Sequence, residues 1–256
     1  GTMSGAGGVT KSGAGTLTLT GANDYTGATS IAAGTLSINT VDVSTNAQSL
    51  GQGTTVNLGV ASTSSGTLVY TGAGGTLDKN INALGNGSDT IQNDGGGLLT
   101  LTGTLTKNGT VLTLKNGSFT VSGKVTGSLA NSDLVVDNAT VTLTNVNNDY
   151  NGPTIIRNSG KVIVAGDYLG AVPGSATVGN VVLDSGTLNA SDSFTLASNR
   201  GLAVGGTGTG TIEVDATKIL TYGGIMANNG AGTGGLTKTG TGTLVLPAPG
   251  QLLASG

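Results

Sequence analysis

Residues 7–38 read GGVTKSGAGTLTLTGANDYTGATSIAAGTLSI, and this stretch decides the fold. In its GTLTLTG run, Leu17 and Leu19 alternate with threonines, so a strand here has one apolar and one polar face. Gly, Asn and Asp separate the strand-like pieces, and these residues favour turns. The stretch therefore predicts short strands, each with one buried face, joined by tight turns.

The same sequence pattern recurs twice along the chain. Residues 8–19, GVTKSGAGTLTL, align without gaps on residues 235–246, GLTKTGTGTLVL. A diverged copy at 140–164 places Tyr150 on Tyr25, Gly152 on Gly27 and Ile156 on Ile31. Repeat-like segments thus occupy 7–38, 140–164 and 234–246, which indicates a repeat architecture.

The composition selects a solenoid among the all-β folds. The 256 residues include 48 glycines and only 3% aromatic side chains, too few for the cores of sandwiches or propellers. Stacked coils need only aliphatic stripes inside. We predict one domain over 1–256, a right-handed parallel β-helix of about ten to twelve coils, roughly 50 Å long.

Several classes of chemistry are disfavoured by what the chain lacks. It has no Cys and no His, which removes disulfides and the usual zinc ligand sets. A formal charge of −3 without a basic cluster argues against nucleic acid as a partner. No apolar stretch approaches the ~20 residues of a membrane helix, so we expect no direct membrane insertion. We predict no catalytic, cofactor or metal site.

Residues 7–38 resemble the passenger-associated transport repeat, also called the autotransporter-associated β-strand repeat. Residues 181–246 resemble the segment that leads into such a repeat. The resemblance implies a β-helical passenger exported by type V secretion, extracellular at the bacterial surface and attached in the full protein to an outer-membrane β-barrel. It implies a structural stalk or adhesin-type segment, whose partners would be glycans or proteins of host or neighbouring cell surfaces.

The ends of the chain carry two further expectations. The opening Gly-Thr-Met is typical of a cloning remnant, so we expect the natural protein to extend beyond both ends. After Leu246, the tail PAPGQLLASG replaces the Asn-Tyr-Gly continuation of the repeat. Pro247 and Pro249 cannot donate ladder hydrogen bonds, so we expect this tail to cap the last coil.

The alternative is a passenger enzyme acting on polysaccharide, and Glu213 and Asp215 are its strongest candidates. Two apart on a strand, their carboxylates would share a face about 6 to 7 Å apart, within the range of an inverting glycosidase pair. Ile212 and Val214 would then form the core, leaving the two acids as an exposed polar edge. We favour this second interpretation, and with it a protein that is not an enzyme.

Other acidic residues have simpler interpretations. Asp89, in GNGSDTI, matches most of a calcium-binding nonapeptide, but the next nine residues do not continue it, so we expect an ordinary turn, with calcium a minor alternative. Asp133 and Asp137 share a face about 13 Å apart and are expected to be solvated. GTGTGT at 206–211 lacks the Lys and the helix of a phosphate loop.

Two aromatic positions repeat, Tyr25 and Tyr150. They could stack on sugars, but we expect each to pack a turn against the neighbouring coil, with Asn23 or Asn148 capping backbone groups. The aliphatic residues of the repeats are expected to point inward: Leu17, Leu19, Leu36, Ile38, Leu244 and Leu246.

Overall fold

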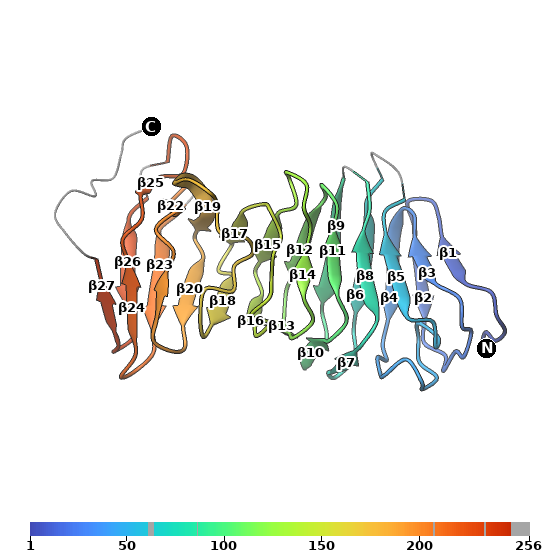
Figure 1. Cartoon of the computed structure of the whole chain (residues 1–256). Helices are drawn as coiled ribbons and strands as arrows, with labels where there is room; N and C mark the ends of the chain where they lie inside the picture. The colour runs from blue at the N-terminus through green and yellow to red at the C-terminus, as the bar shows by residue number, and fades with distance from the viewer. Residues whose placement is uncertain (61–63, 86, 207, 233, 247–256) are drawn as a thin grey trace.

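The chain coils into an elongated rod whose short strands run across its long axis (Figure 1). The computed structural model describes residues 1–60, 64–85, 87–206, 208–232 and 234–246. Over these residues all named strands pair in parallel, in four sheets of ten, eight, six and three strands. β1 lies at one end of the rod and β27 at the other (Figure 1).

Each sheet runs along the rod as one stripe of stacked strands. The ten-stranded sheet contains β2 (Thr16–Leu19), β4 (Gly34–Ile38), β6 (Gly66–Tyr70), β9 (Ser88–Asn93), β12 (Val111–Lys115), β15 (Leu134–Asp137), β17 (Thr154–Arg157), β19 (Thr177–Asp184), β22 (Arg200–Val204) and β25 (Met226–Asn228). The eight-stranded sheet contains β7 (Gly75–Leu77), β10 (Leu98–Leu101), β13 (Ser118–Val121), β16 (Thr140–Leu143), β18 (Lys161–Val164), β20 (Thr187–Ala190), β23 (Gly210–Val214) and β26 (Leu236–Thr239).

The two shorter sheets take the remaining side of the coil. The six-stranded sheet contains β1 (Val9–Lys11), β3 (Thr29–Ile31), β5 (Thr55–Leu58), β8 (Asn80–Ala83), β11 (Leu105–Lys107) and β14 (Val125–Thr126). The three-stranded sheet contains β21 (Phe194–Leu196), β24 (Ile219–Tyr222) and β27 (Thr243–Val245). We number the coils 1 to 10 by the successive strands of the ten-stranded sheet.

The core consists of columns of side chains stacked from coil to coil. Because the strands pair in parallel, each inward residue lies beside the inward residue of the next coil. One column in the ten-stranded sheet is aliphatic over nine successive coils: Leu17, Leu36, Leu68, Ile91, Leu114, Val136, Ile156, Leu183 and Val204. Period-2 alternation puts threonine and other polar residues on the outer face.

The predicted parallel solenoid is confirmed, with ten coils. Its right-handed winding, and its description as one domain over 1–256, stay predictions. The described residues contain no helix, and hence none long enough to cross a membrane.

Of the residues expected inside, Leu36 and Ile38 are buried, while Leu17, Leu19 and Leu244 in the end coils pack partly buried against the core. Leu246 is a correction: it is 47% exposed, because it follows the last residue of β27, which is the end strand of its sheet among the described residues. The expected cap at 247–256, with Pro247 and Pro249, lies outside the described residues.

Candidate functional site

Tyr25 and Tyr150 occupy equivalent buried turns in the two halves of the rod. Their exposed fractions are 2% and 0%, so neither ring is available to stack on a sugar. Each phenol hydroxyl lies 2.6 Å from a buried threonine hydroxyl four residues on, Thr29 in the first turn and Thr154 in the second. Burial raises the pKa of Tyr150 to about 12. The packing interpretation of these tyrosines is confirmed.

An asparagine two residues before each tyrosine connects three coils. The Asn148 side chain accepts a hydrogen bond from the Val125 amide at 2.8 Å and donates one to the Tyr168 carbonyl at 2.9 Å. Asn23 repeats this pattern, accepting from Met3 and donating to the Ser49 carbonyl, both at 2.9 Å. The expected capping role of these asparagines is therefore confirmed.

The turn stacked on each tyrosine is a Leu-Gly pair. Leu50 and Leu169 are buried, and the following glycines have positive φ, 63° at Gly51 and 83° at Gly170. A Cβ on Gly170 would lie 2.6 Å from the Tyr150 carbonyl oxygen and 2.9 Å from its ring. Only glycine allows the backbone this close to the tyrosine.

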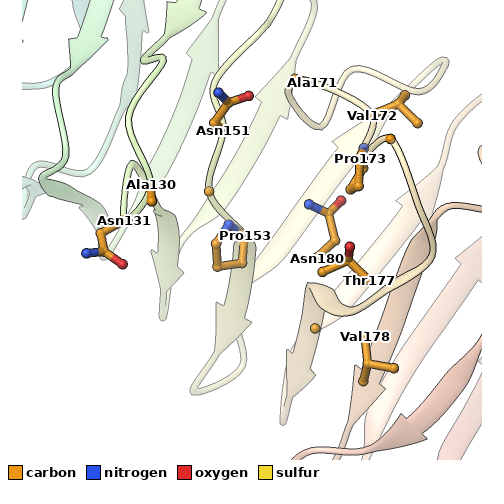
Figure 2. Close-up of a pocket in the computed structure, with 13 residues that line it drawn as sticks. Ala130, Asn131, Asn151, Pro153, Ala171, Val172, Pro173, Thr177, Val178 and Asn180 are labelled. Atoms are coloured by element: carbon orange, nitrogen blue, oxygen red, sulfur yellow. The ribbon is translucent and has the colours of Figure 1, made fainter.

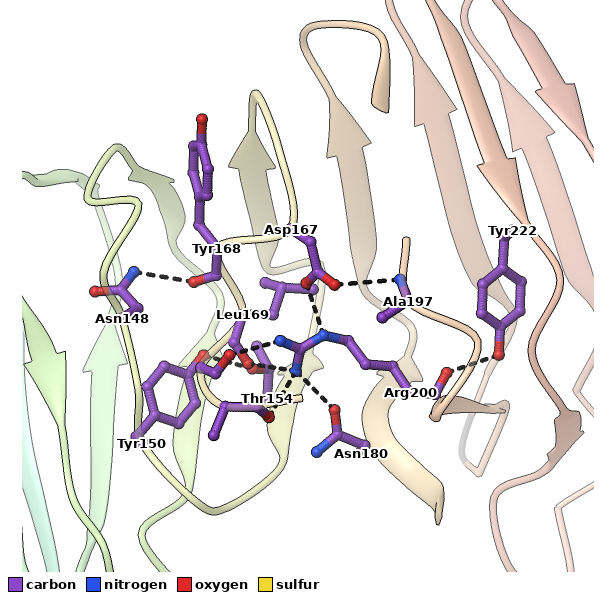
Figure 3. A network of polar contacts seen from close by, with 12 residues as sticks. Asn148, Tyr150, Thr154, Asp167, Tyr168, Leu169, Asn180, Ala197, Arg200 and Tyr222 are labelled. Carbon is purple, nitrogen blue, oxygen red and sulfur yellow. Dashed lines mark hydrogen bonds and ion pairs between the residues drawn. The ribbon is translucent and has the colours of Figure 1, made fainter. Parts of the chain in front are cut away.

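A buried cation then covers the carbonyls of each Leu-Gly turn. Lys79 donates to the carbonyls of Gly51, at 2.9 Å, and of Gly53, at 2.5 Å. Arg200, with no exposed surface, donates to the carbonyls of Leu169, Gly170 and Ala171 (Figure 3). Its Nε lies 2.6 Å from the Asp167 carboxylate.

The Asn-Tyr turn, the Leu-Gly turn and the cation form a three-layer polar unit, which is built twice. Its tyrosines could be found from the repeat text. Its cations could not, because Lys79 and Arg200 lie in dissimilar sequence surroundings. The asparagines and cations of the unit bond to backbone groups, and its tyrosine hydroxyls pair with threonine hydroxyls, so the unit's chemistry is structural.

A second lysine pattern ends the first strand of the repeat text. Lys11 donates to the carbonyls of Ser12, Gly13 and Ala33, and Lys238 donates to Thr239 and Gly240. The lysine of the repeated Thr-Lys pair therefore caps the turn that follows it, with three acceptors at Lys11 and two at Lys238.

Lys107 also ends a strand, but it is fully buried. It donates to the Ser132 carbonyl at 2.7 Å, and its ammonium lies 3.8 Å from the centroid of the Tyr150 ring. Burial lowers the pKa of Lys107 well below its usual range, and the nearby Asp133 opposes that shift.

The Glu213 and Asp215 carboxylates are both engaged with partners. Ile212 and Val214 are buried, as expected for the core face between them. Glu213 forms an ion pair with Lys161 at 2.8 Å, a contact that spans two coils and that sequence spacing did not reveal. Asp215 accepts a hydrogen bond from Asn189 at 2.8 Å. These contacts fit an ion-paired outer edge.

Asp89 is not in a turn: it is the second residue of β9, it is fully buried, and it faces the core. In register it lies beside Leu112, in the inward column that continues to Leu134. Its Oδ1 accepts from the Gly66 amide at 2.7 Å, while Oδ2 has no partner among the described residues. Burial raises the pKa of Asp89 to about 6. The expectation of an ordinary turn was wrong because a core-facing strand position was read as loop.

The expectation of solvation is wrong for Asp133, which has a buried carboxyl oxygen, but not for Asp137, whose hydrogen bonds lie at the exposed surface. Asp137 forms an ion pair with Arg157 at 2.9 Å and accepts from Asn158. Asp133 Oδ1 is buried without a hydrogen bond from any residue that the structure describes, and burial raises the pKa of this carboxyl against the influence of Lys107. Asp137 thus contacts the next coil, while Asp133 lies near Lys107 of the preceding coil, and the sequence does not show either neighbour.

The remaining sequence candidates stay unassigned. In GTGTGT, Thr207 lies outside the described residues, while Gly210 and Thr211 open β23 rather than a helix. Within the part of the chain that the structure describes, no three His, Cys, Asp or Glu side chains gather as a metal site would need. Calcium at Asp89 is untested.

A groove of about 500 Å³ lies on the outer surface where the chain enters β15, β17 and β19, across coils 6 to 8 (Figure 2). Sequence reasoning missed it. Thirteen residues line it: Ala130, Asn131, Asn151, Gly152, Pro153, Ala171, Val172, Pro173, Gly174, Thr177, Val178, Gly179 and Asn180. The signal was the sequence AVPGSATVGN at 171–180, a long uncharged stretch with a proline and two valines in an otherwise compact repeat.

A rod of stacked coils, with its polar groups used to hold turns together, belongs to the class of β-solenoid scaffolds. The passenger-associated-transport-repeat family matches residues 9–38, 137–164 and 236–248. The chain thus carries passenger-associated transport repeats in three places, and it is extracellular, at the bacterial surface.

One curated relative is the adhesin BmaC autotransporter of Brucella suis biovar 1. It is 39% identical over 255 residues, which cover 96% of this chain and 6% of that protein. The chain thus spans only a small part of the relative it matches. No solved structure matches the chain significantly.

Proposed function

We propose that this chain is a rigid stalk segment of a longer, type V secreted surface protein, and that it adheres to host or neighbouring cells. In the full protein it would be attached to an outer-membrane β-barrel, with cell-surface proteins or glycans as partners. The proposal draws on the relative named an adhesin and on the transport repeats.

The observation that carries the stalk role is the parallel stacking of all ten strands of the ten-stranded sheet. Ten strands stacked about 4.8 Å apart give a rod about 45 Å long. Nine coils share one aliphatic column, so bending the rod would open packed contacts. Such a rod holds the parts at its two ends at a fixed distance.

We propose further that the segment is not an enzyme. Glycoside cleavage needs one carboxylic acid and one carboxylate facing the scissile bond. Glu213 is held by Lys161 and Asp215 by Asn189, so both are committed to neighbouring coils. This supports a binding and spacing role over the polysaccharide-degrading alternative.

Adhesion is tested with microspheres coated with the folded chain and placed on cultured epithelial cells under flow. We expect the beads to be retained several-fold better than beads coated with a Leu114→Asp variant, whose buried charge should disrupt the coils. Equal retention of the two coatings, or no retention of either, would contradict the adhesive role. Small-angle scattering on the same sample checks the length of the rod.

A further inference from the structure

The groove across coils 6 to 8 differs in chemistry from the rest of the rod. Its thirteen lining residues include no charged and no aromatic side chain. Val172 and Val178 are 49% and 48% exposed, and Pro153 and Pro173 extend the apolar surface between them. On a rod whose outer face is largely threonine and asparagine, a concave apolar surface of this size marks a site of interaction.

The groove is formed by an irregularity in the stacking. β17 pairs residues 154–157 with residues 181–184 of β19, which leaves the first four residues of β19 beyond the end of that ladder. On the other side, Thr177 pairs with Arg200 and Val181 with Leu202, so three residues bulge out opposite Gly201. The bulge separates the backbone of coil 8 from coil 7 at this corner, and the groove lies between them.

Each of the three coils contributes one asparagine to the groove: Asn131, Asn151 and Asn180. Asn151 uses its amide nitrogen to donate to the Ser128 carbonyl, which leaves its oxygen as an acceptor. Asn180 uses its oxygen to accept from Arg200, which leaves its nitrogen as a donor. In Figure 2 this oxygen and this nitrogen are turned toward the space between the two coils. The groove thus offers an acceptor and a donor about one coil apart.

We infer that this groove binds an extended, uncharged polypeptide segment of a partner protein, rich in small aliphatic residues. A peptide group presents one donor and one acceptor, which complement Asn180 and Asn151. Aliphatic side chains would fill the surface between the valines and prolines. A charged segment would lose hydration there without gaining a counter-charge.

The same lining disfavours a sugar chain. Carbohydrate recognition by stacking needs an aromatic face, and none lines the groove. A sugar would also lay several hydroxyls against valine and proline surface, where they find no partner. This inference rests on the proposed adhesive function, and it names a polypeptide as the partner class.

A single substitution can fill the groove and so test its role. A Cβ at Gly174 would meet no atom within 4 Å, and no positive φ constrains this position, so Gly174→Phe should fill the groove without disturbing the coil. Gly96 has the same open surroundings and does not line the groove, so Gly96→Phe is the matched control. A second pair is Val178→Asp inside the groove and Val146→Asp, 64% exposed, outside it.

The experiment titrates the isotope-labelled chain with capped hexapeptides made of Ala, Val, Pro, Ser and Asn, and follows backbone NMR shifts. Parallel titrations use Lys- or Asp-containing versions and two neutral oligosaccharides, cellohexaose and N-acetylglucosamine hexamer. We expect the neutral peptides to shift the groove residues, with affinity reduced about tenfold or more in Gly174→Phe and Val178→Asp. Gly96→Phe and Val146→Asp should bind as the parent does.

Three results would overturn the inference: no peptide binding at millimolar concentration, binding that the groove variants leave unchanged, or oligosaccharides binding in the groove in place of peptides. The bead assay separates this failure from failure of the adhesive function. Beads that still adhere when coated with Gly174→Phe would place adhesion elsewhere on the rod. Peptide binding without bead adhesion would retain the groove and reject the adhesive function.

Discussion

At the scale of single residues, Gly51 and Gly170 show how one missing Cβ allows two coils to stack. Both glycines combine a positive φ with a carbonyl and a tyrosine ring in the space of a side chain. We predict that Gly170→Ala lowers the free energy of unfolding by about 2 to 4 kcal/mol, from backbone strain and overpacking together. Urea denaturation measures the loss. Gly96→Ala, in open space, is the control, and equal stability of the two variants would contradict the packing argument.

Asp89 is the residue whose environment most clearly couples stability to pH. Its pKa of about 6 in the folded chain lies above the ordinary 3.8, so folding favours the protonated form. This contribution is fully present below about pH 4 and is lost as the pH rises through 6. We predict that Asp89→Asn removes a decrease on the order of 2 to 3 kcal/mol in the unfolding free energy across that window.

The measurement for Asp89 is urea denaturation of parent and variant at a series of pH values from 4 to 8. The difference between the two curves isolates Asp89 from the other carboxylates. Above pH 6 the asparagine variant should be the more stable protein, because it buries no charge. Parallel curves, with a constant difference over the whole range, would mean that Asp89 does not titrate in this window.

At the scale of elements, the asparagine before each tyrosine connects three successive coils. Asn148→Ala would leave the Val125 amide and the Tyr168 carbonyl without their partner. We predict a loss of about 2 to 4 kcal/mol in unfolding free energy, because one buried and one partly buried hydrogen bond disappear. Asn147→Ala changes an exposed neighbour and should cost little. Thermal denaturation compares them, and a similar melting temperature for both would refute the bridging role.

The strands themselves could be predicted from the local sequence, while the contacts between coils could not. The GTLTLTG run contains β2, because its alternation and its bounding Gly are local properties. The contact between Lys161 and Glu213 joins residues 52 apart, and it depends on the length of every turn between them. The groove likewise results from a bulge of three residues, which the periodicity of the sequence does not predict.

At the scale of the whole molecule, the sequence repeats made the fold predictable. They did not reveal the positions that depart from the repeat pattern. The repeated Tyr25 and Tyr150 were expected to pack turns, and they do. Asp89 was read as a turn residue because Gly and Asn surround it, yet it continues a core column. Composition could not show this, since burial of a carboxyl is set by the neighbouring coils. Sequence patterns therefore predicted the architecture. The polar units became visible only in the structure, where neighbouring coils stack on one another.

A rod of stacked coils should lose its structure from the ends inward. Each coil packs only on its two neighbours, so an end coil has half the contacts of an inner one. The burial of the inward side chains reflects this difference in contacts. Leu17 and Leu19 in coil 1 are only partly buried, whereas Leu114 in coil 5 is 1% exposed. We predict that backbone amides of coils 1 and 10 exchange with deuterium at least tenfold faster than those of coils 4 to 8, because local opening is easier there. Leu17→Ala should raise exchange in coils 1 and 2 only, whereas Leu114→Ala should lower the stability of the whole rod. Hydrogen-exchange mass spectrometry on both variants and the parent tests this, and uniform exchange along the parent would show that the ten coils open as a single unit.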